Sequence, residues 1–266
     1  MSKRFVIVSG ANGGIGRKIV ELLIKEDYEV IALDLSNSNI KDLGCHYFYC
    51  DVLNRETIEL VYQEITKITS AIYAIINAVG IFKMQSIIEG NEDDFKRIMD
   101  INFFGVYHLN KIFFPLLKKG SRIINITSEV ARYSPQPFEG YYNLSKIFLD
   151  NYTDVLRREA SYLGIQVTKV QCGAMSTKLV SSVNGEYEEM VKNSDHFKEP
   201  LTKLKYMMDR EITKQRDPTV AARKIVKITS KSRLKLVYRI KNSFALWFIG
   251  HLPEKWQDKI YRKVIK

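Results

Sequence analysis

The sequence predicts an α/β protein built on a doubly wound parallel sheet of about seven strands, with helices on both faces. Three observations lead to this prediction. Short β-branched runs alternate with stretches of helical periodicity along the first 172 residues. The helical stretches are long enough to form right-handed crossovers between parallel strands. No linker or internal repeat interrupts this part of the chain, and 266 residues, 45% of them apolar, can bury one large core.

The predicted strands are short runs of apolar and β-branched residues. The first, at 5–8, is closed by Ser9 and Gly10, and the second ends on an acid, Asp34. The seventh is predicted over 234–238, where apolar residues alternate with cations. The other predicted strands lie at 29–33, 46–50, 72–76, 122–127 and 165–170.

Helices are predicted where apolar residues recur every three or four positions. Asn54 is a favourable N-cap for one of them, and Asp217 followed by Pro218 suits the start of another. The stretch 92–118 is predicted as one long helix, which Pro115 kinks or ends. The remaining predicted helices lie at 15–26, 54–69, 141–162 and 253–261.

The segment 174–216 interrupts this alternation. It is polar, charged and irregular, and it follows the carboxyl end of a predicted strand, where long inserts usually cover a site. We therefore expect a substrate lid within 174–216. The apolar residues that would line its pocket are Leu179, Val180, Tyr187, Met190, Leu201, Leu204, Tyr206, Met207 and Met208.

A glycine-rich loop follows the first predicted strand directly. Gly10, Gly14 and Gly16 stand in the segment SGANGGIG, which leads into the first helix. Such a loop permits a tight turn and the close approach of a pyrophosphate, whose charge the helix N-terminus stabilises. An ordinary strand–helix turn is the alternative. The strand, the loop, the helix and the acid at the next strand end together favour a Rossmann-type dinucleotide fold.

Asp34 bears on the choice of cofactor. A carboxylate at this strand end accepts hydrogen bonds from the adenosine ribose and repels a 2′-phosphate. No Lys or Arg stands just before the second glycine or just after Asp34, and Arg17 is expected to face solvent. These features predict NAD rather than NADP, although Asp34 is also suited to capping a turn.

Four polar residues suggest a catalytic centre. Tyr142 and Lys146 are four residues apart and therefore share one helix face. This spacing alone is common, but Ser128 stands 14 residues upstream, just past the fifth strand, and Asn102 lies within the preceding long helix. With these residues in this order, the chain resembles the main single-domain branch of the short-chain dehydrogenase/reductase family, and loosely its hydroxysteroid dehydrogenases.

Further segments carry the resemblance. Asp51-Val52 is similar to the family's acid–aliphatic pair at the adenine, and 77–80 resembles its Asn-Asn-Ala-Gly signature, with Ala78 at the second position. The segment 173–177 resembles the Pro-Gly-x-x-x-Thr segment near the nicotinamide, with Cys172 in place of the proline. The cofactor-binding residues that the resemblance and the glycine loop imply are Gly10, Asn12, Gly14, Ile15, Gly16, Asp34, Asp51, Val52, Asn77, Ala78, Gly80, Tyr142, Lys146, Gly173 and Thr177.

The resemblance also implies a mechanism. A free tyrosine, with a pKa of about 10, is a poor base, and Lys146 with the positive nicotinamide would favour the Tyr142 phenolate. Tyr142 would then act as the acid or base while Ser128 holds the substrate oxygen. In the family, the lysine that matches Lys146 also binds the ribose, and the asparagine that matches Asn102 holds a water. His46 and His108 are alternative acid–base residues, although a lone histidine in an apolar stretch is more often structural.

The net charge of +11 is concentrated at the end of the chain. From residue 198 onward there are 19 Lys and Arg against 6 Asp and Glu, whereas the rest of the chain has 22 against 24. The segment 231–266 interleaves its cations with aromatic residues that include both tryptophans. It is interpreted as a helical face packed on the domain or a dimer partner, or as an interfacial helix on anionic lipid. Nucleic acid is a disfavoured partner, because no recognised binding module is present.

The three cysteines, Cys45, Cys50 and Cys172, have no CxxC spacing, and we expect free thiols in a reducing cytoplasm. No stretch has the length of a signal peptide core or a membrane span, and no residues have metal-ligand spacing. We therefore predict a cytoplasmic protein without a metal, with possible peripheral membrane contact through 231–266.

The predicted organisation is one NAD-binding catalytic domain over 1–240 and a basic, aromatic helical extension over 241–266. The predicted activity is hydride transfer between NAD(H) and a hydrophobic secondary alcohol or ketone, either steroid-like, retinoid or long-chain. The resemblance also implies a homodimer or homotetramer, assembled through the two long helices at 92–118 and 141–162. The rival hypothesis is a catalytically idle nucleotide-binding scaffold that docks on a membrane or partner through its basic tail.

Overall fold

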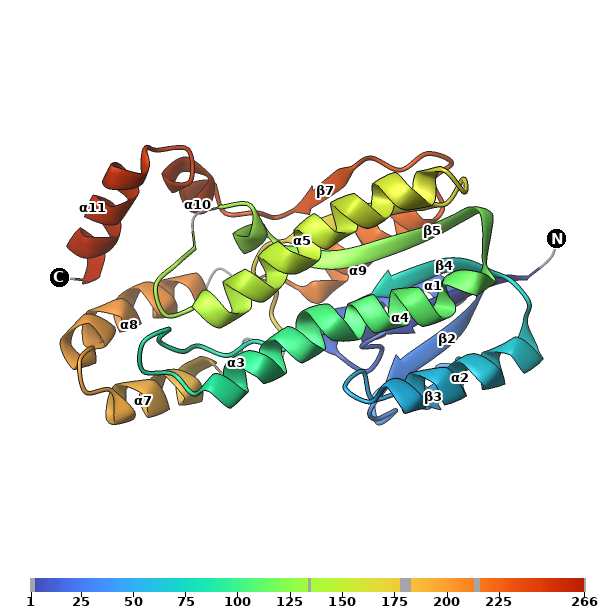
Figure 1. Ribbon diagram of the computed structural model, residues 1–266, viewed down its shortest axis with the longest axis horizontal. Coiled ribbons are helices and arrows are strands. Elements are labelled where there is room, and N and C mark those ends of the chain that lie inside the picture. The colour runs from blue at the N-terminus through green and yellow to red at the C-terminus, as the bar shows by residue number, and fades with distance from the viewer. Residues whose placement is uncertain (1–2, 134, 178–182, 213–215, 266) are drawn as a thin grey trace.

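The computed structural model describes residues 3–133, 135–177, 183–212 and 216–265. Seven strands form one sheet in the order β3-β2-β1-β4-β5-β6-β7, and all neighbouring strands are parallel (Figure 1). This confirms the predicted doubly wound α/β fold. The strands are β1 (Arg4–Ser9), β2 (Tyr28–Asp34), β3 (His46–Tyr49), β4 (Ile72–Asn77), β5 (Leu117–Ser128), β6 (Gln166–Cys172) and β7 (Val237–Ile240).

Alternate side chains of each strand enter two separate cores. Val6 and Val8 of β1 pack in a core with α1 and α9, whereas Ile7, between them, packs on the opposite face with α2, α4 and α5. Because both faces are covered, the strands are continuous apolar runs rather than alternating ones. The helices are α1 (Gly14–Lys25), α2 (Arg55–Ile68), α4 (Gly105–Phe113), α5 (Gly140–Ser161) and α9 (Pro218–Thr229).

Two helix starts follow the predicted capping. The Asn54 side chain accepts hydrogen bonds from the backbone N–H groups of Glu56 and Thr57, and Asp217 accepts one from Thr219 at 2.7 Å. These contacts satisfy N–H groups that have no partner within the helix.

The predicted helix over 92–118 is one continuous helical run over 92–116 that ends at the turn with Pro115, but it contains a π turn that the periodicity did not predict. Helix α3 (Glu92–Met99) passes into one π turn at Asp100–Phe104 before α4 begins, and a 3-10 turn at Phe114–Leu116 contains Pro115. The proline has no N–H to continue the helix, so the chain leaves it there. Strand β5 therefore starts at Leu117, five residues earlier than the predicted 122. It pairs with β4 at Leu117 and, after an irregularity in the register, again from Arg122 to Asn125.

The seventh strand lies further along the chain than the predicted 234–238. Pairing with β6 runs from Val237 to Ile240, and Tyr238 and Ile240 are buried. The residues before it are held by side chains instead: Leu234 donates its N–H to the Gln166 side chain, at 2.8 Å. The pairing register of the edge strand β7 is therefore set by the burial of Tyr238 and Ile240.

The predicted irregular lid over 174–216 is largely helical. Helices α7 (Val183–Asn193) and α8 (Lys198–Ile212) fill most of it. Tyr187, Met190 and Leu201 are buried against one another and Phe138, with Leu204 at the edge of this cluster. These apolar residues recur at helical spacing, and their burial stabilises the two helices. Leu179 and Val180 lie outside the described residues, and nothing is described of the side chains at 206–208.

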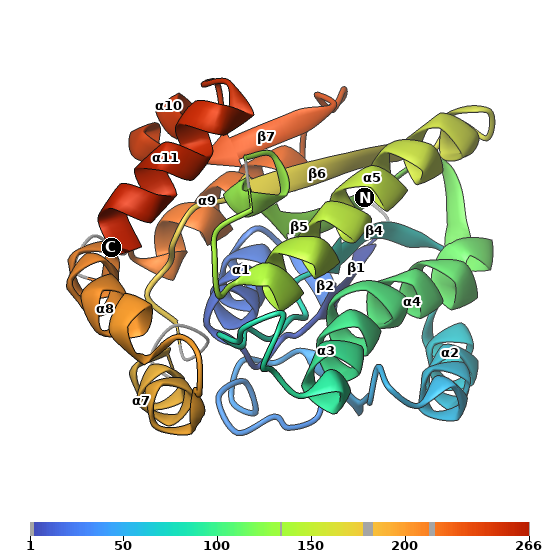
Figure 2. The ribbon, with the colours of Figure 1, turned by 60° about the vertical axis from the view of Figure 1, so that its left-hand side comes forward.

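After β7 the chain forms two further helices, α10 (Phe244–Ile249) and α11 (Glu254–Ile265), the second of which extends beyond the predicted 253–261. They lie beyond the carboxyl ends of the strands, and α11 packs beside α8 (Figure 2). Within the described ranges, the structure contains no helix with the length and apolar character needed to cross a bilayer.

Candidate active site

The predicted site residues gather at the carboxyl edge of the sheet. Ser9, Asn77 and Ser128 are the last residues of β1, β4 and β5, and Ser128 pairs with Cys172 at the end of β6. Loops that leave parallel strands at this edge converge, which is where open α/β sheets bind their ligands.

The glycine loop is packed too closely for side chains. Gly10 has φ +66°, and a methyl group on it would lie 2.7 Å from the backbone nitrogen of Val79. A methyl group on Gly16 would lie 2.0 Å from the Gly10 carbonyl oxygen. In the described part of the chain no side chain caps α1, whose N-cap is Gly13. Its first N–H groups therefore suit a phosphate, and the loop fits a dinucleotide.

Thr177 closes the other side of this loop. A methyl group on Gly14 would lie 2.6 Å from the Thr177 Cγ2 atom, so the two segments touch. Ile15, the next residue, packs partly buried against the core beneath α1. The structure thus brings the segment after β6 to the glycine loop, as the predicted cofactor site requires.

Asp34 stands at the tip of β2 beside the glycine loop. Its carboxylate accepts hydrogen bonds from the N–H of Asn12, at 2.9 Å, and from the N–H of Leu35, at 2.8 Å. Arg17, the basic residue nearest the loop in sequence, pairs with Glu21 at 2.9 Å along α1. The carboxylate therefore belongs to the loop that would hold the adenosine.

Asp51 and Val52 follow β3. One Asp51 carboxylate oxygen accepts the N–H of Leu53 at 2.9 Å, which shapes the turn into α2. Val52 packs against Gly105 at the start of α4, where a methyl group would lie 2.8 Å from its Cβ. Asp51 thus shapes the turn between β3 and α2, and Val52 contacts the start of α4.

The Asn77 side chain is held by hydrogen bonds in the interior, at the carboxyl end of β4. Its buried side chain accepts a hydrogen bond from the Ser9 hydroxyl at 3.0 Å and donates to Asn110 and Asn125, each at 2.8 Å. These bonds join β1, β4, β5 and α4 in the interior. The neighbouring Ala78 contributes its backbone N–H to the Ser9 carbonyl, at 3.0 Å.

Gly80, Asn102 and Lys146 meet at one point. A methyl group on Gly80 would lie 3.1 Å from the Lys146 Nζ and 3.3 Å from the Asn102 Oδ1. Asn102 stands in the π turn, where its amide bonds both backbone groups of Ile81, at 2.8 and 2.9 Å, and donates to Ser145 at 3.0 Å. Single π turns often occur at functional sites, and here the turn holds Asn102 beside the lysine.

Tyr142 lies at the centre of the predicted catalytic group. Its hydroxyl is hydrogen-bonded to the Ser128 side chain, and Lys146 Nζ lies 5.6 Å from the centroid of its ring. Burial raises the pKa of Tyr142 above its ordinary value, while the Ser128 hydrogen bond opposes that rise. Burial also lowers the pKa of Lys146 to about 8. The chain's own groups therefore favour the neutral phenol.

Two carboxylates near Tyr142 were missed by sequence reasoning. Glu129 follows Ser128 and is buried, and Glu139 precedes Tyr142 by three residues at the start of α5. Burial and the charge of Glu129 raise the pKa of Glu139 to about 7, and both carboxylates raise the pKa of Tyr142. Their positions beside Ser128 and Tyr142 in the sequence were the available signal.

Gly173 joins the site to the C-terminal residues. Its N–H donates to the Ile240 carbonyl at 2.9 Å, and a methyl group on it would lie 2.3 Å from the Lys241 carbonyl oxygen and 3.1 Å from Glu129 Oε1. Glu129 also accepts the backbone N–H of Ser243. The residues after β7 are therefore anchored beside Ser128, through its neighbour Glu129.

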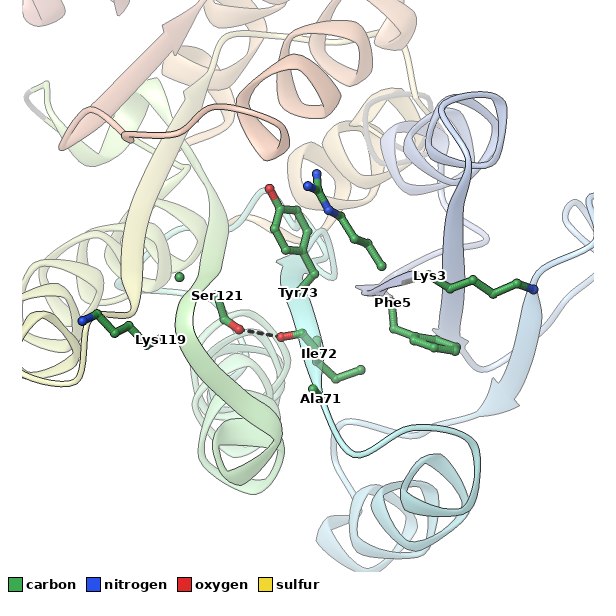
Figure 3. A pocket seen from close by; sticks show the side chains of 9 residues that line it. Lys3, Phe5, Ala71, Ile72, Tyr73, Lys119 and Ser121 are labelled. Atoms are coloured by element: carbon green, nitrogen blue, oxygen red, sulfur yellow. Dashed lines mark hydrogen bonds between the residues drawn. The ribbon is translucent and has the colours of Figure 1, made fainter. Parts of the chain in front are cut away.

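A cavity of about 320 Å³ lies at the opposite, amino-terminal edge of the sheet (Figure 3). It lies beside the first residues of β1 and β4, and Ser121 donates a hydrogen bond to the Ile72 carbonyl at 2.7 Å in its wall. It shares no residue with the site above. Elsewhere, within the described residues, no group of three or more His, Cys, Asp or Glu is placed to hold a metal ion.

Known proteins are similar to this chain in sequence and in fold. A family model described as short chain dehydrogenase matches residues 4–188. The chain is 30% identical over 209 residues to the NADPH-dependent 1-acyldihydroxyacetone phosphate reductase of Schizosaccharomyces pombe, covering 76% of this chain and 70% of that one. It is 26% identical over 271 residues to the probable short-chain type dehydrogenase/reductase VdlC of Helicobacter pylori, covering 97% of both. The fold matches a short-chain dehydrogenase of Streptomyces avermitilis with a TM-score of 0.77, 19% identity and coverage of 99% and 97%.

The fold and these matches define an oxidoreductase with a Rossmann-type sheet. The chain belongs to the short-chain dehydrogenase/reductase family. Members of this family use a nicotinamide cofactor.

Proposed function

We propose that the protein transfers hydride between a nicotinamide cofactor and a hydrophobic secondary alcohol or ketone. The observation that carries the proposal is the grouping of Ser128, Tyr142 and Lys146 at the edge where the glycine loop lies. The bound cofactor supplies the hydride donor or acceptor and, when oxidised, a positive charge. Ser128 holds the substrate oxygen, and Tyr142 gives or takes its proton.

Lys146 has two tasks in this proposal. It binds the cofactor ribose, and its charge offsets the factors that raise the pKa of Tyr142. Burial lowers the pKa of Lys146 to about 8. A negative charge, or a hydroxyl oxygen that accepts a hydrogen bond from Nζ, raises this pKa again and so favours the charged form of the lysine. Asn102 fixes the position of the backbone at Ile81 beside it.

An apolar substrate is supported by the walls of the site. The Phe82 ring lies 5.1 Å from the Tyr142 ring, and Phe82 packs against the cluster of Met84, Phe138 and Leu201. The reductase of Schizosaccharomyces pombe is named for a substrate with an acyl chain. Steroid-like, retinoid and long-chain alcohols or ketones are the classes we propose to test.

NAD is the cofactor we propose. The Asp34 carboxylate occupies the loop where a 2′-phosphate would approach, and Arg17 is engaged by Glu21. Two like charges at this place would repel each other. The relative in Schizosaccharomyces pombe is NADPH-dependent, so the test must include both cofactors. A preference for NADPH would refute the role given to Asp34.

The test is a panel of steroids, retinoids and long-chain ketones with NADH and NADPH, followed by Tyr142→Phe. We expect this variant to lose turnover by at least about 10²-fold while it still binds NADH. Tyr141→Phe is the matched control, because the Tyr141 ring stacks on Phe95 of α3, and this variant should retain turnover. Near-normal kcat in Tyr142→Phe would refute the mechanism. NADH binding without turnover across the panel would favour the nucleotide-binding scaffold.

We also propose a homo-oligomer assembled through α4 and α5. Phe104, just before α4, and Phe148 and Val155, on α5, are exposed apolar side chains on this face. Covering such side chains in a partner subunit is favourable. Light scattering of the purified protein tests this, and a monomer at all concentrations would refute it.

A further inference from the structure

Helix α10 is an apolar helix that buries none of its side chains. Its sequence is FALWFI, and Phe244, Trp247 and Phe248 are 74%, 39% and 51% exposed. The Phe244 and Trp247 rings stack at 5.3 Å, so they form one continuous surface. Apolar area left in water costs roughly 25 cal/mol per Å². A contiguous exposed patch of this kind marks a binding surface.

Cations flank this helix in the sequence and lie on the neighbouring helix α11. Trp256 of α11 is 60% exposed, and Lys259 Nζ lies 5.5 Å from the centroid of its ring. The ion pairs found in the described part of the chain involve none of the cations between residues 241 and 263. We call residues 241–263 the basic aromatic surface. Its cations are Lys241, Lys255, Lys259, Arg262 and Lys263, against two acids, Glu254 and Asp258.

The chemistry of this surface selects its partner. Tryptophan and phenylalanine flanked by lysine and arginine suit the boundary of a bilayer, where rings enter the interface and cations meet headgroup phosphates. A second copy of the chain is a poor partner, because a symmetric contact would set these cations against their own copies. We propose that the basic aromatic surface binds an anionic phospholipid bilayer.

The position of this surface connects it with the active site. Ser243, directly before α10, donates its N–H to Glu129, the neighbour of Ser128. Gly250, directly after α10, lies against Tyr133, where a methyl group would be 3.1 Å from the ring. A bilayer on this surface therefore lies beside the site that would take an apolar alcohol or ketone. Binding to the bilayer does not depend on that proposed activity.

The experiment uses the two tryptophans as reporters, since both belong to the basic aromatic surface. The full chain is mixed with vesicles of phosphatidylcholine alone, or of phosphatidylcholine with phosphatidylglycerol. We expect a blue shift of tryptophan emission and flotation with the anionic vesicles only. About 0.5 M NaCl should reverse most of the binding, because it screens the headgroup contacts.

Two double variants separate the contributions. Phe244→Ser with Phe248→Ser should weaken partitioning at least about tenfold and leave the melting temperature unchanged, since neither ring is buried. Lys255→Gln with Lys259→Gln should weaken binding to anionic vesicles about tenfold. The matched control is Tyr162→Ser, which removes a ring that is 90% exposed at the far end of α5 and should change nothing.

Three results would overturn the proposal. The first is an unchanged emission spectrum with anionic vesicles. The second is equal loss of binding in Tyr162→Ser, which would mean unspecific adsorption. The third is a blue shift that depends on protein concentration without vesicles, which would identify a second copy of the chain as the partner. Loss of oxidoreductase turnover alone leaves all three readouts intact, so the two proposals fail separately.

Discussion

Replacing Asn77 with alanine should destabilise the fold more than it weakens cofactor binding. The Asn77 side chain makes three buried hydrogen bonds, at 2.8, 2.8 and 3.0 Å, to Asn110, Asn125 and Ser9. Each bond contributes about 1 kcal/mol, and each partner left unpaired in the interior adds desolvation cost. We therefore expect a loss of about 3–5 kcal/mol in the free energy of unfolding, a large part of the 5–15 kcal/mol typical of native proteins.

The assay is urea unfolding without nucleotide, followed by titration of the folded variant with NADH. Ser9→Ala is the matched control, because it removes only one of the three bonds and should cost about 1 kcal/mol. If Asn77 instead acted mainly on the cofactor, Asn77→Ala would keep its stability and lose NADH affinity. A loss of stability below about 1 kcal/mol in Asn77→Ala would refute the structural role.

Three further predictions concern the catalytic group. Gly80→Ala places a methyl group 3.1 Å from Lys146 Nζ and 3.3 Å from Asn102 Oδ1, so we expect kcat/KM to fall about tenfold with an unchanged circular dichroism spectrum. Lys146→Met should raise the free energy of unfolding near neutral pH by about 3 kcal/mol, because burial disfavours the ammonium. The pKa of Lys146 is about 8 in the folded chain and 10.5 ordinarily. Between pH 8 and pH 10.5, Lys146 is therefore protonated in the unfolded chain and deprotonated in the folded chain. The free energy of unfolding of the wild type should therefore rise from pH 8 to pH 10.5. Urea unfolding at these two pH values should show that Lys146→Met is more stable than the wild type at the lower pH and no longer so at the higher one. Glu139→Gln removes a carboxylate with a pKa of about 7 that raises the pKa of Tyr142, so the pH profile of alcohol oxidation should move to lower pH; an unchanged profile would contradict this.

Local sequence signals predicted most of the elements. The caps at Asn54 and Asp217 depend on contacts within three residues, and both are present. Each of the seven strands predicted from the apolar pattern overlaps the strand that the structure contains, and the largest differences are at the starts of β5 and β7. Over 92–118, by contrast, periodicity alone did not distinguish one helix from two helices joined by a π turn.

The segment 174–216 and the last strand were harder to predict, because their structure depends on residues distant in the sequence. Tyr187 and Leu201 become buried only when α7 and α8 meet Phe138, far away in sequence. Val237 to Ile240 form a strand in the register that β6 provides. Charged residues between these apolar positions made the same segments resemble irregular sequence.

The sequence by itself determined the parallel α/β sheet, the glycine loop and the identity of the residues at its carboxyl edge, because these depend on spacing along the chain. Only the tertiary structure decided how those side chains are used. It turned the Asn77 amide into the interior, and it set Glu129 and Glu139 beside Tyr142. It also anchored Ser243 on Glu129, which are 114 residues apart. The physical reason is that hydrogen bonds and burial act between groups that packing brings together, and no local pattern records them.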